Sequence, residues 1–121
     1  MASYSYRLPW PPSVNCYIRR GNNRSYMTKA GKQFRENVFA DVVKAHDGDI
    51  WPLEGRLAVS IELTAPDRRE RDIDNHIKAT LDALQHAGSF VKDSQIDELV
   101  VKRLHVEPPG CCDVTIQEIE A

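Results

Sequence analysis

Three stretches of the chain space their apolar side chains regularly, and each spacing predicts one kind of element. Residues 56–63 alternate strictly between apolar and polar positions, which predicts a strand with one buried face. Residues 28–45 place apolar side chains about every four positions after a capping residue, Thr28, which predicts an amphipathic helix. A second apolar stripe predicts a helix over 74–88, with Asp74 at its start and Gly88, a residue type that commonly ends helices, at its close.

Three further strands complete the predicted fold. Residues 4–8 form a short opening strand, which the prolines after it end because proline lacks the amide proton of a sheet ladder. The runs 98–106 and 113–119 are predicted to pair with each other as a hairpin across 107–110. We therefore expect one compact domain over residues 1–121, in the order β-α-β-α-β-β. Its class would be α/β or α+β, with a small mixed sheet and two helices.

Positive charge is concentrated at the start of the chain. The net charge is -2, yet residues 1–35 contain seven of the 16 Lys and Arg residues and none of the 18 Asp and Glu residues. The segment 13–27 is predicted to be a loop, and its arginines could follow a phosphate backbone, because neutralising phosphates drives association with nucleic acid. A solvated basic surface has the same composition, so charge alone leaves both interpretations open. The candidate DNA-binding side chains in this part are Arg19, Arg20, Arg24, Lys29 and Lys32.

Composition excludes several classes of protein. No apolar run approaches the roughly 20 residues that span a bilayer, and the first residues do not read as a secretory signal, so we expect a cytoplasmic protein. The three cysteines include the adjacent Cys111 and Cys112, which is a poor arrangement for a disulfide framework. The histidines do not fall at zinc-ligand spacings either, so a structural zinc site has little support.

The stretch 66–75, PDRRERDIDN, carries the clearest candidate chemistry. Hydrolysis of a phosphodiester needs an activated water and a stabilised anionic transition state, and Mg²⁺ held by carboxylates can supply both. Asp72 and Asp74 are two residues apart at a helix entrance, where extended backbone would project both side chains to one side. Asn75 follows directly, and Lys78 lies four residues after Asp74, where its ammonium could reach a bound phosphate.

Each of these residues also has an ordinary structural interpretation. Asp74 could simply cap the predicted helix and accept hydrogen bonds from its first-turn amides. Arg68, Arg69 and Arg71 could pair with neighbouring acids at the surface, whereas beside a metal site they would hold phosphates.

Four segments of the chain together match a known family. They are YRLPWPPSVN, SYMTKAGKQFREN, PDRRERDIDNHIKATLDALQHAG and FVKDSQI. Through them the chain resembles the RusA Holliday-junction resolvases, small homodimeric endonucleases of bacteria and their phages. The resemblance covers nearly the whole length, and the order of PDRR, RDIDN, a lysine three residues on, LDAL, AG and D-x-Q-I is specific.

The resemblance implies a reaction and a set of site residues. Asp72, Asp74 and a third acid, Asp93, would bind Mg²⁺, Lys78 would be the catalytic lysine, and Asp82 would orient that lysine. A two-fold homodimer would cut two strands of a four-way DNA junction symmetrically, in recombination and repair, and the basic opening segment with the arginines of PDRRERDIDN would line the DNA.

Two positions depart from the family pattern, and two other functions stay open. Val14 stands where family members often have an extra Asn, and Lys92 stands where they often have Asp, which affects substrate detail more than the reaction. The chain could instead be a non-catalytic DNA-binding module whose acids only cap a helix. It could also be a nuclease that acts on other branched DNA, such as forks and flaps.

Overall fold

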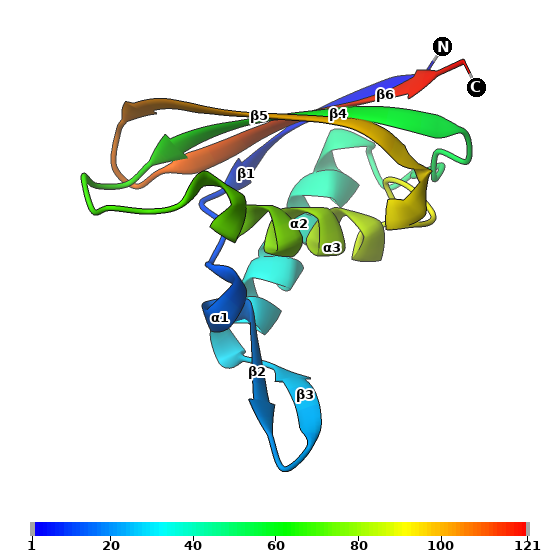
Figure 1. Cartoon of the computed structure of the whole chain (residues 1–121). Helices are drawn as coiled ribbons and strands as arrows, with labels where there is room; N and C mark the ends of the chain where they lie inside the picture. The colour runs from blue at the N-terminus through cyan, green and yellow to red at the C-terminus, as the bar shows by residue number, and fades with distance from the viewer. Residues whose placement is uncertain (1, 121) are drawn as a thin grey trace.

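The centre of the fold is a four-stranded mixed sheet, seen at the top of Figure 1 in a computed structural model that describes residues 2–120. The strand order is β1-β6-β4-β5, in which β6 runs antiparallel to both of its neighbours and β5 runs parallel to β4. The strands are β1 (Ser3–Pro9), β4 (Arg56–Ala65), β5 (Ile96–Val106) and β6 (Cys111–Ile119).

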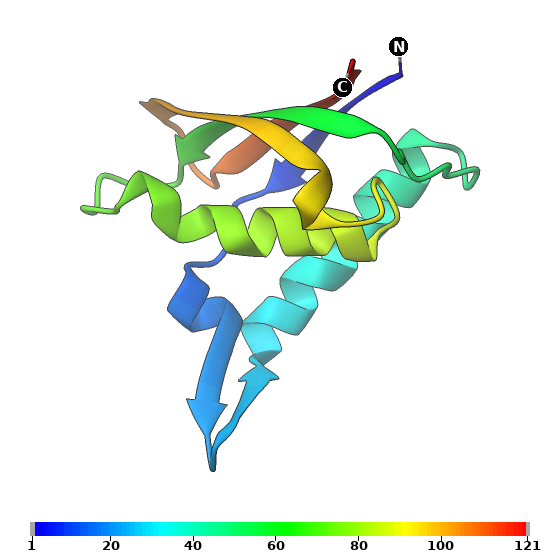
Figure 2. The same cartoon turned by 45° about the vertical axis from the view of Figure 1, so that its right-hand side comes forward.

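Two helices cover one face of this sheet, and a small hairpin projects away from it (Figures 1 and 2). The helices are α2 (Lys29–Ala45) and α3 (Ile77–His86). The hairpin consists of β2 (Ile18–Gly21) and β3 (Arg24–Met27), and the single-turn helix α1 (Val14–Tyr17) lies at its base. Two short 3-10 turns, η1 (Ile73–His76) and η2 (Asp93–Gln95), flank α3 in the chain. In the described part of the chain, no helix is both long and apolar enough to span a bilayer.

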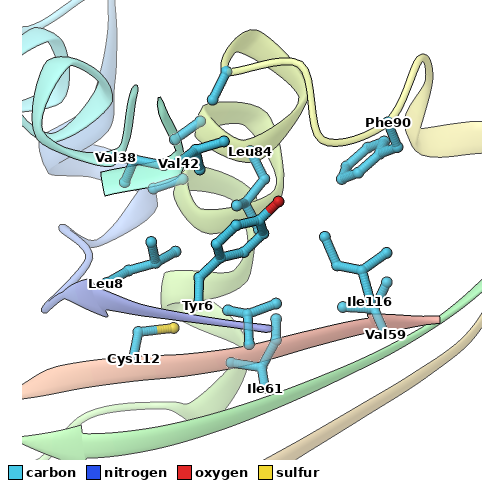
Figure 3. Close-up of a cluster of buried hydrophobic side chains, with 14 of the residues drawn as sticks. Tyr6, Leu8, Val38, Val42, Val59, Ile61, Leu84, Phe90, Cys112 and Ile116 are labelled. Carbon is cyan, nitrogen blue, oxygen red and sulfur yellow. The ribbon is translucent and has the colours of Figure 1, made fainter. Parts of the chain in front are cut away.

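The hydrophobic core lies between the sheet and the two helices, as Figure 3 shows. The alternation predicted in β4 is confirmed, since its apolar positions are buried while Ala58, Ser60 and Glu62 are only partly covered. Apolar side chains of α2 and α3 meet these positions, and each buried aliphatic side chain contributes about 1.5–3 kcal/mol to folding. Labelled members of the core are Leu8, Val38, Val42, Val59, Ile61, Leu84, Phe90 and Ile116.

The predicted start of α2 is confirmed in detail. The hydroxyl of Thr28 accepts a hydrogen bond from the amide of Gly31 at 2.9 Å, as expected of a helix cap. A Cβ atom at Gly31 would come within 2.5 Å of the carbonyl oxygen of Tyr17. Glycine is therefore required for α2 to approach the end of α1, and this contact fixes the base of the hairpin.

The predicted pairing of the last two strands is wrong. β4 lies between β5 and β6 and pairs with both, so the connection 107–110 crosses the end of β4. The amide of Glu107 donates to the carbonyl of Ala65 at 2.8 Å, and a Cβ atom at Gly110 would meet the Thr64 carbonyl at 3.1 Å. Gly110 also has a φ of +85°, which glycine adopts without strain. The turn residues that suggested a hairpin thus serve a wider crossover.

The segment 13–27 is also more ordered than the predicted loop. Gly21 pairs with Arg24 in the β2–β3 register, so Asn22 and Asn23 alone form the turn. Both asparagines have positive φ, 51° and 61°, as the two central residues of a type I′ turn require. Asparagine tolerates this conformation well, so the Asn-Asn pair in fact encodes a tight hairpin.

Candidate active site and DNA-binding surface

The chain that leaves β4 forms a turn organised by Asp67. Its carboxylate accepts hydrogen bonds from the Arg69 amide at 3.0 Å and from the Arg71 guanidinium at 2.7 Å. These hydrogen bonds, the Arg69 amide first, hold the pKa of Asp67 below its usual value. The guanidinium of Arg71 also lies 5.5 Å from the ring centroid of Trp10, and Arg103 donates to the Arg71 carbonyl at 2.6 Å. Arg71 therefore shapes the turn, while Arg69 stays 82% exposed.

Asp72 and Asp74 lie at the entrance to η1, on the exposed side of this turn. Asp72 precedes η1 with extended backbone, whereas Asp74 is within its first turn, so the extended-backbone argument applies to Asp72 alone. The predicted α-helix start at Asp74 is wrong by three residues, because the 3-10 turn precedes α3. Within residues 2–120, neither carboxylate forms a helix-cap hydrogen bond or a salt bridge. The capping interpretation of Asp74 is thus not supported, and both carboxylates are free to bind a ligand.

Lys78, in the first turn of α3, lies near two further acids. Burial raises the pKa of Asp93, the Lys78 charge opposes that rise, and the Asp82 charge adds to it. The same lysine charge helps to lower the pKa of Asp82. The three side chains therefore lie close enough to interact electrostatically.

The turn that carries Asp93 is held by the buried side chain of Gln95. Its amide oxygen accepts hydrogen bonds from the amides of Val91 and Lys92, at 2.9 and 2.7 Å. Its amide nitrogen donates to the carbonyls of Leu53 and Gly55, both at 2.8 Å. In the sequence, Gln95 is marked only as part of the family motif D-x-Q-I. Its structural role depends on partners 40 residues away, which no local pattern shows.

Asp82 joins three helices. Its carboxylate accepts hydrogen bonds from the Tyr17 hydroxyl, at the end of α1, and from the Arg35 guanidinium of α2 at 2.7 Å. Burial alone would raise the pKa of Asp82, but these two hydrogen bonds and the nearby cations outweigh it and hold that pKa below 3.8. Burial and the Asp82 hydrogen bond raise the pKa of Tyr17 to about 12. Asp82 thus acts on Lys78 through its charge and its placement, and sequence reasoning missed both Tyr17 and Arg35 as its partners.

Replacement of Asp82 by Asn is expected to lower the free energy of unfolding by about 2 kcal/mol, because it weakens two hydrogen bonds to a charged group. Since the folded pKa of Asp82 lies below the unfolded value of 3.8, its contribution is complete above that pH and is lost as the pH falls through the folded pKa. Urea unfolding at pH 7 and at stepwise lower pH would measure the difference. Asp97→Asn, which removes an exposed pair with Arg56, should lower the free energy of unfolding by clearly less than Asp82→Asn does.

The five candidate DNA-binding side chains of the opening segment lie at the hairpin or directly after it, whereas two other basic residues of that segment, Arg7 and Arg35, do not. Arg19 and Arg20 line a groove of about 600 Å³ that Lys78 also lines. Arg24 is exposed on β3, and Lys29 and Lys32 are exposed at the start of α2, directly after the hairpin. Arg7 is instead paired with Asp113 on the sheet, and Arg35 is turned toward Asp82. We call Arg19, Arg20, Arg24, Lys29 and Lys32 the hairpin patch.

A second groove, of about 470 Å³, runs along the PDRRERDIDN turn. Arg69, Asp72 and Asn75 line it together, along with Ser13 from the segment before α1. Arg68 is exposed beside it. The structure therefore brings one predicted metal ligand, two predicted phosphate-binding arginines, Arg69 and Arg71, and Asn75 to the same concave surface.

The three predicted metal ligands are not assembled into one cluster. Among residues 2–120, no three His, Cys, Asp or Glu side chains are grouped closely enough to hold a metal ion. Asp72 and Asp74 are adjacent at η1, whereas Asp93 lies at η2 beside Lys78 and Asp82. Like charges repel at close range unless a cation neutralises them, so carboxylates without a metal have no reason to converge.

Comparison with known proteins places the chain in a family. The family model for endodeoxyribonuclease RusA matches residues 9–117. The chain is 40% identical to the crossover junction endodeoxyribonuclease RusA of Escherichia coli K12, over 98% of both chains. It is 39% identical to the protein of that name from Enterobacteria phage 82, over 98% of both chains. A relative from Enterobacteria phage HK97 is 36% identical, over 100% of this chain and 99% of its own length. The chain therefore belongs to the RusA family of endodeoxyribonucleases.

Proposed function

We propose that this protein is a crossover junction endonuclease that cuts four-way DNA junctions with the help of Mg²⁺, in recombination and repair. The observation that carries the proposal is that Asp72, next to Asp74 and like it without a side-chain partner in the described residues, lines one groove with arginines, while Lys78 lines the other. DNA in these grooves would bring a phosphate to the carboxylates. Its relatives come from bacteria and phages, so we place the protein in the bacterial cytoplasm.

The donor set suits Mg²⁺. This ion prefers oxygen ligands and usually binds one or two carboxylates while it keeps several waters. Asp72 and Asp74 offer two exposed carboxylates without competing partners in the described residues, and we propose Asp93 as a third ligand. Burial already raises the pKa of Asp93, and a nearby cation would lower that pKa again. Membership in a nuclease family agrees with a metal requirement in general.

The remaining residues act on the scissile phosphate. A bound Mg²⁺ would supply an activated water and would neutralise charge on the phosphate oxygens. Lys78 places an ammonium near Asp93, where it stabilises the negative charge that develops during hydrolysis. Arg69 and Asn75 hold the backbone along their groove, and the hairpin patch binds phosphates further away. Asp82 keeps Lys78 in place by anchoring α3 to α1 and α2.

We also propose that the protein acts as a homodimer, because a four-way junction presents two equivalent strands. The edge strand β5 is the surface that supports this. Among the strands of residues 2–120 it pairs with β4 alone, and it exposes Leu99, Val100, Leu104 and Val106 by 39–50%. A long apolar edge strand readily pairs with another chain, and two copies of β5 can pair around a two-fold axis.

The double variant Val100→Lys/Leu104→Lys is expected to be monomeric, because charged side chains on an edge strand oppose pairing. Light scattering after size exclusion would then give a mass near 13.8 kDa, against about twice that for the unchanged protein. Thr115→Lys, on an exposed position of the inner strand β6, is the control and should leave the mass of the dimer unchanged. A dimer that survives both lysines would exclude β5 as the interface.

The function itself is tested on four synthetic DNAs of matched length: a mobile four-way junction, a fork, a flap and a plain duplex. We expect cleavage of the junction in Mg²⁺, in two symmetric strands, and none in EDTA. Binding without cutting in any metal would instead indicate the non-catalytic module. Equal cutting of forks and flaps would widen the substrate to branched DNA in general.

A further inference from the structure

A separate cavity of about 230 Å³ lies beside the proposed metal site. Its floor is apolar and comes from the ends of β4 and β5 and from η1, through Leu63, Ala65, Val106 and Ile73. Its rim carries guanidinium groups, of which Arg68 and Arg69 are exposed. The proposed function assigns no role to this cavity.

One wall of the cavity holds an incomplete hydrogen-bond network. His76 is only 5% exposed, and its Nδ1 lies 2.9 Å from the carbonyl oxygen of Pro11. Its Nε2 is buried and has no partner within residues 2–120. Buried polar atoms are almost always hydrogen-bonded, and an unfilled position costs about 1–3 kcal/mol. The Trp10 ring packs against this imidazole, with 4.8 Å between the ring centroids. The aromatic surface of Trp10 therefore lies next to the unpaired nitrogen of His76.

This combination of surfaces matches one class of ligand. An apolar lining with an aromatic ring accepts a flat heterocycle, and the arginines beside it can hold a phosphate attached to that heterocycle. A water-sized group occupies about 30 Å³, so the cavity has room for roughly eight such groups. That number corresponds to the size of a single nucleobase.

The cavity is also within reach of the DNA strand. Arg69, Arg71, Asp72 and His76 line both this cavity and the groove that contains Asn75. A strand in that groove therefore passes the mouth of the cavity next to Asp72. A base is cheapest to unstack where it is mismatched or already unpaired, and the branch point of a junction supplies bases in strained pairs.

We propose that this cavity receives one unpaired nucleobase of the strand that is to be cut, which would lie against the wall formed by Trp10 and His76. The inference deepens the proposed function and rests on it. It makes the cavity a determinant of where on the junction the protein cuts, since only a nucleotide whose base enters the cavity brings its phosphate beside Asp72.

The test uses binding and fluorescence, without cleavage. Trp51 is 71% exposed, so Trp51→Phe leaves Trp10 as the single tryptophan at little cost to the fold. In EDTA, the emission of Trp10 and the affinity by anisotropy are measured with junctions that each carry one abasic nucleotide near the branch point. We expect one abasic position to weaken binding about 5- to 150-fold and to abolish the change in Trp10 emission that the intact junction causes.

A Trp10→Leu variant completes a thermodynamic cycle. The variant should bind the intact junction less tightly than the unchanged protein does. The abasic nucleotide at the sensitive position should then lower the affinity of the variant only slightly, because its stacking partner Trp10 is already absent. Binding that no abasic position weakens would overturn the inference and leave the proposed function standing. A change in Trp10 emission with protein concentration alone would overturn it in favour of a second copy in the cavity. A protein that binds no branched DNA would overturn the proposed function and the inference together.

Discussion

The Asp74→Asn variant is expected to lose metal-dependent cleavage almost completely while it binds a four-way junction at least as tightly as the unchanged protein. Loss of a charged ligand from a catalytic metal site removes several kcal/mol of transition-state stabilisation, which corresponds to a rate loss of at least about 100-fold. Binding should be preserved or strengthened, because the lost negative charge lies beside DNA phosphates and repels them.

The fold should not change in this variant. Asp74 is exposed and has no cap hydrogen bond or salt bridge among the described residues, and Asn has nearly the same shape. Substitutions of this kind alter the free energy of unfolding by about 0.5 kcal/mol or less. A loss of cleavage can then be attributed to chemistry, which Asp82→Asn, with its structural hydrogen bonds, would not permit.

Glu70→Gln is the matched control, since it removes one negative charge from the same exposed turn. Glu70 lines the groove with Asp72 but is not a proposed ligand, so single-turnover cleavage should stay within a few-fold of the unchanged rate. The rate is measured on a synthetic junction in Mg²⁺, and affinity is measured in EDTA. Undiminished cutting by Asp74→Asn would remove this residue from the active site.

Elements that depend on local periodicity could be predicted from the sequence, whereas strand neighbours could not. The alternation of β4 and the four-residue spacing of α2 are properties of single segments, and both are confirmed. The order of β4, β5 and β6 depends on contacts between distant segments, so adjacent strands were paired wrongly across 107–110. The error at 107–110 arose because the same residue types serve loops, hairpins and crossovers. The Gly-Asn-Asn sequence was expected to form a turn or a mobile loop, and the structure has a tight turn at Asn22 and Asn23.

In the candidate site, too, residues that are close in the sequence could be predicted from their spacing, whereas residues from distant segments could not. The spacing of Asp72, Asp74 and Lys78 is visible in the sequence because all three lie within two turns of one segment. Asp93 is 15 or more residues away, and only the family resemblance identified it. Tyr17 and Arg35 contact Asp82 across 65 and 47 residues, so no spacing could reveal them. The basic start of the chain predicted DNA binding, and the fold adds that Arg7 and Arg35, which were not among the candidates, pair with Asp113 and Asp82.

Replacement of Arg19 and Arg20 by Gln is expected to weaken junction binding and to make it less sensitive to salt. Each phosphate contact contributes about 0.9 to the slope of log affinity against log salt, so the slope should fall by about 1.8. Between 50 and 200 mM salt, the affinity ratio of unchanged protein to variant should then narrow by about 12-fold. Adding Arg24→Gln should bring the fall in slope to about 2.7.

The matched control is Arg7→Gln/Lys44→Gln, which removes the same charge from a groove at the other end of α2 from the hairpin. Anisotropy titrations at four salt concentrations would give the slopes for both double variants and for the unchanged protein. The control should keep the full slope, because Arg7 is paired with Asp113 and lies away from the hairpin patch. Equal slopes for the two variants would mean that net charge alone attracts the DNA. A reduced slope for the hairpin variant only would mean that phosphates bind at the hairpin, on the groove that also contains Lys78.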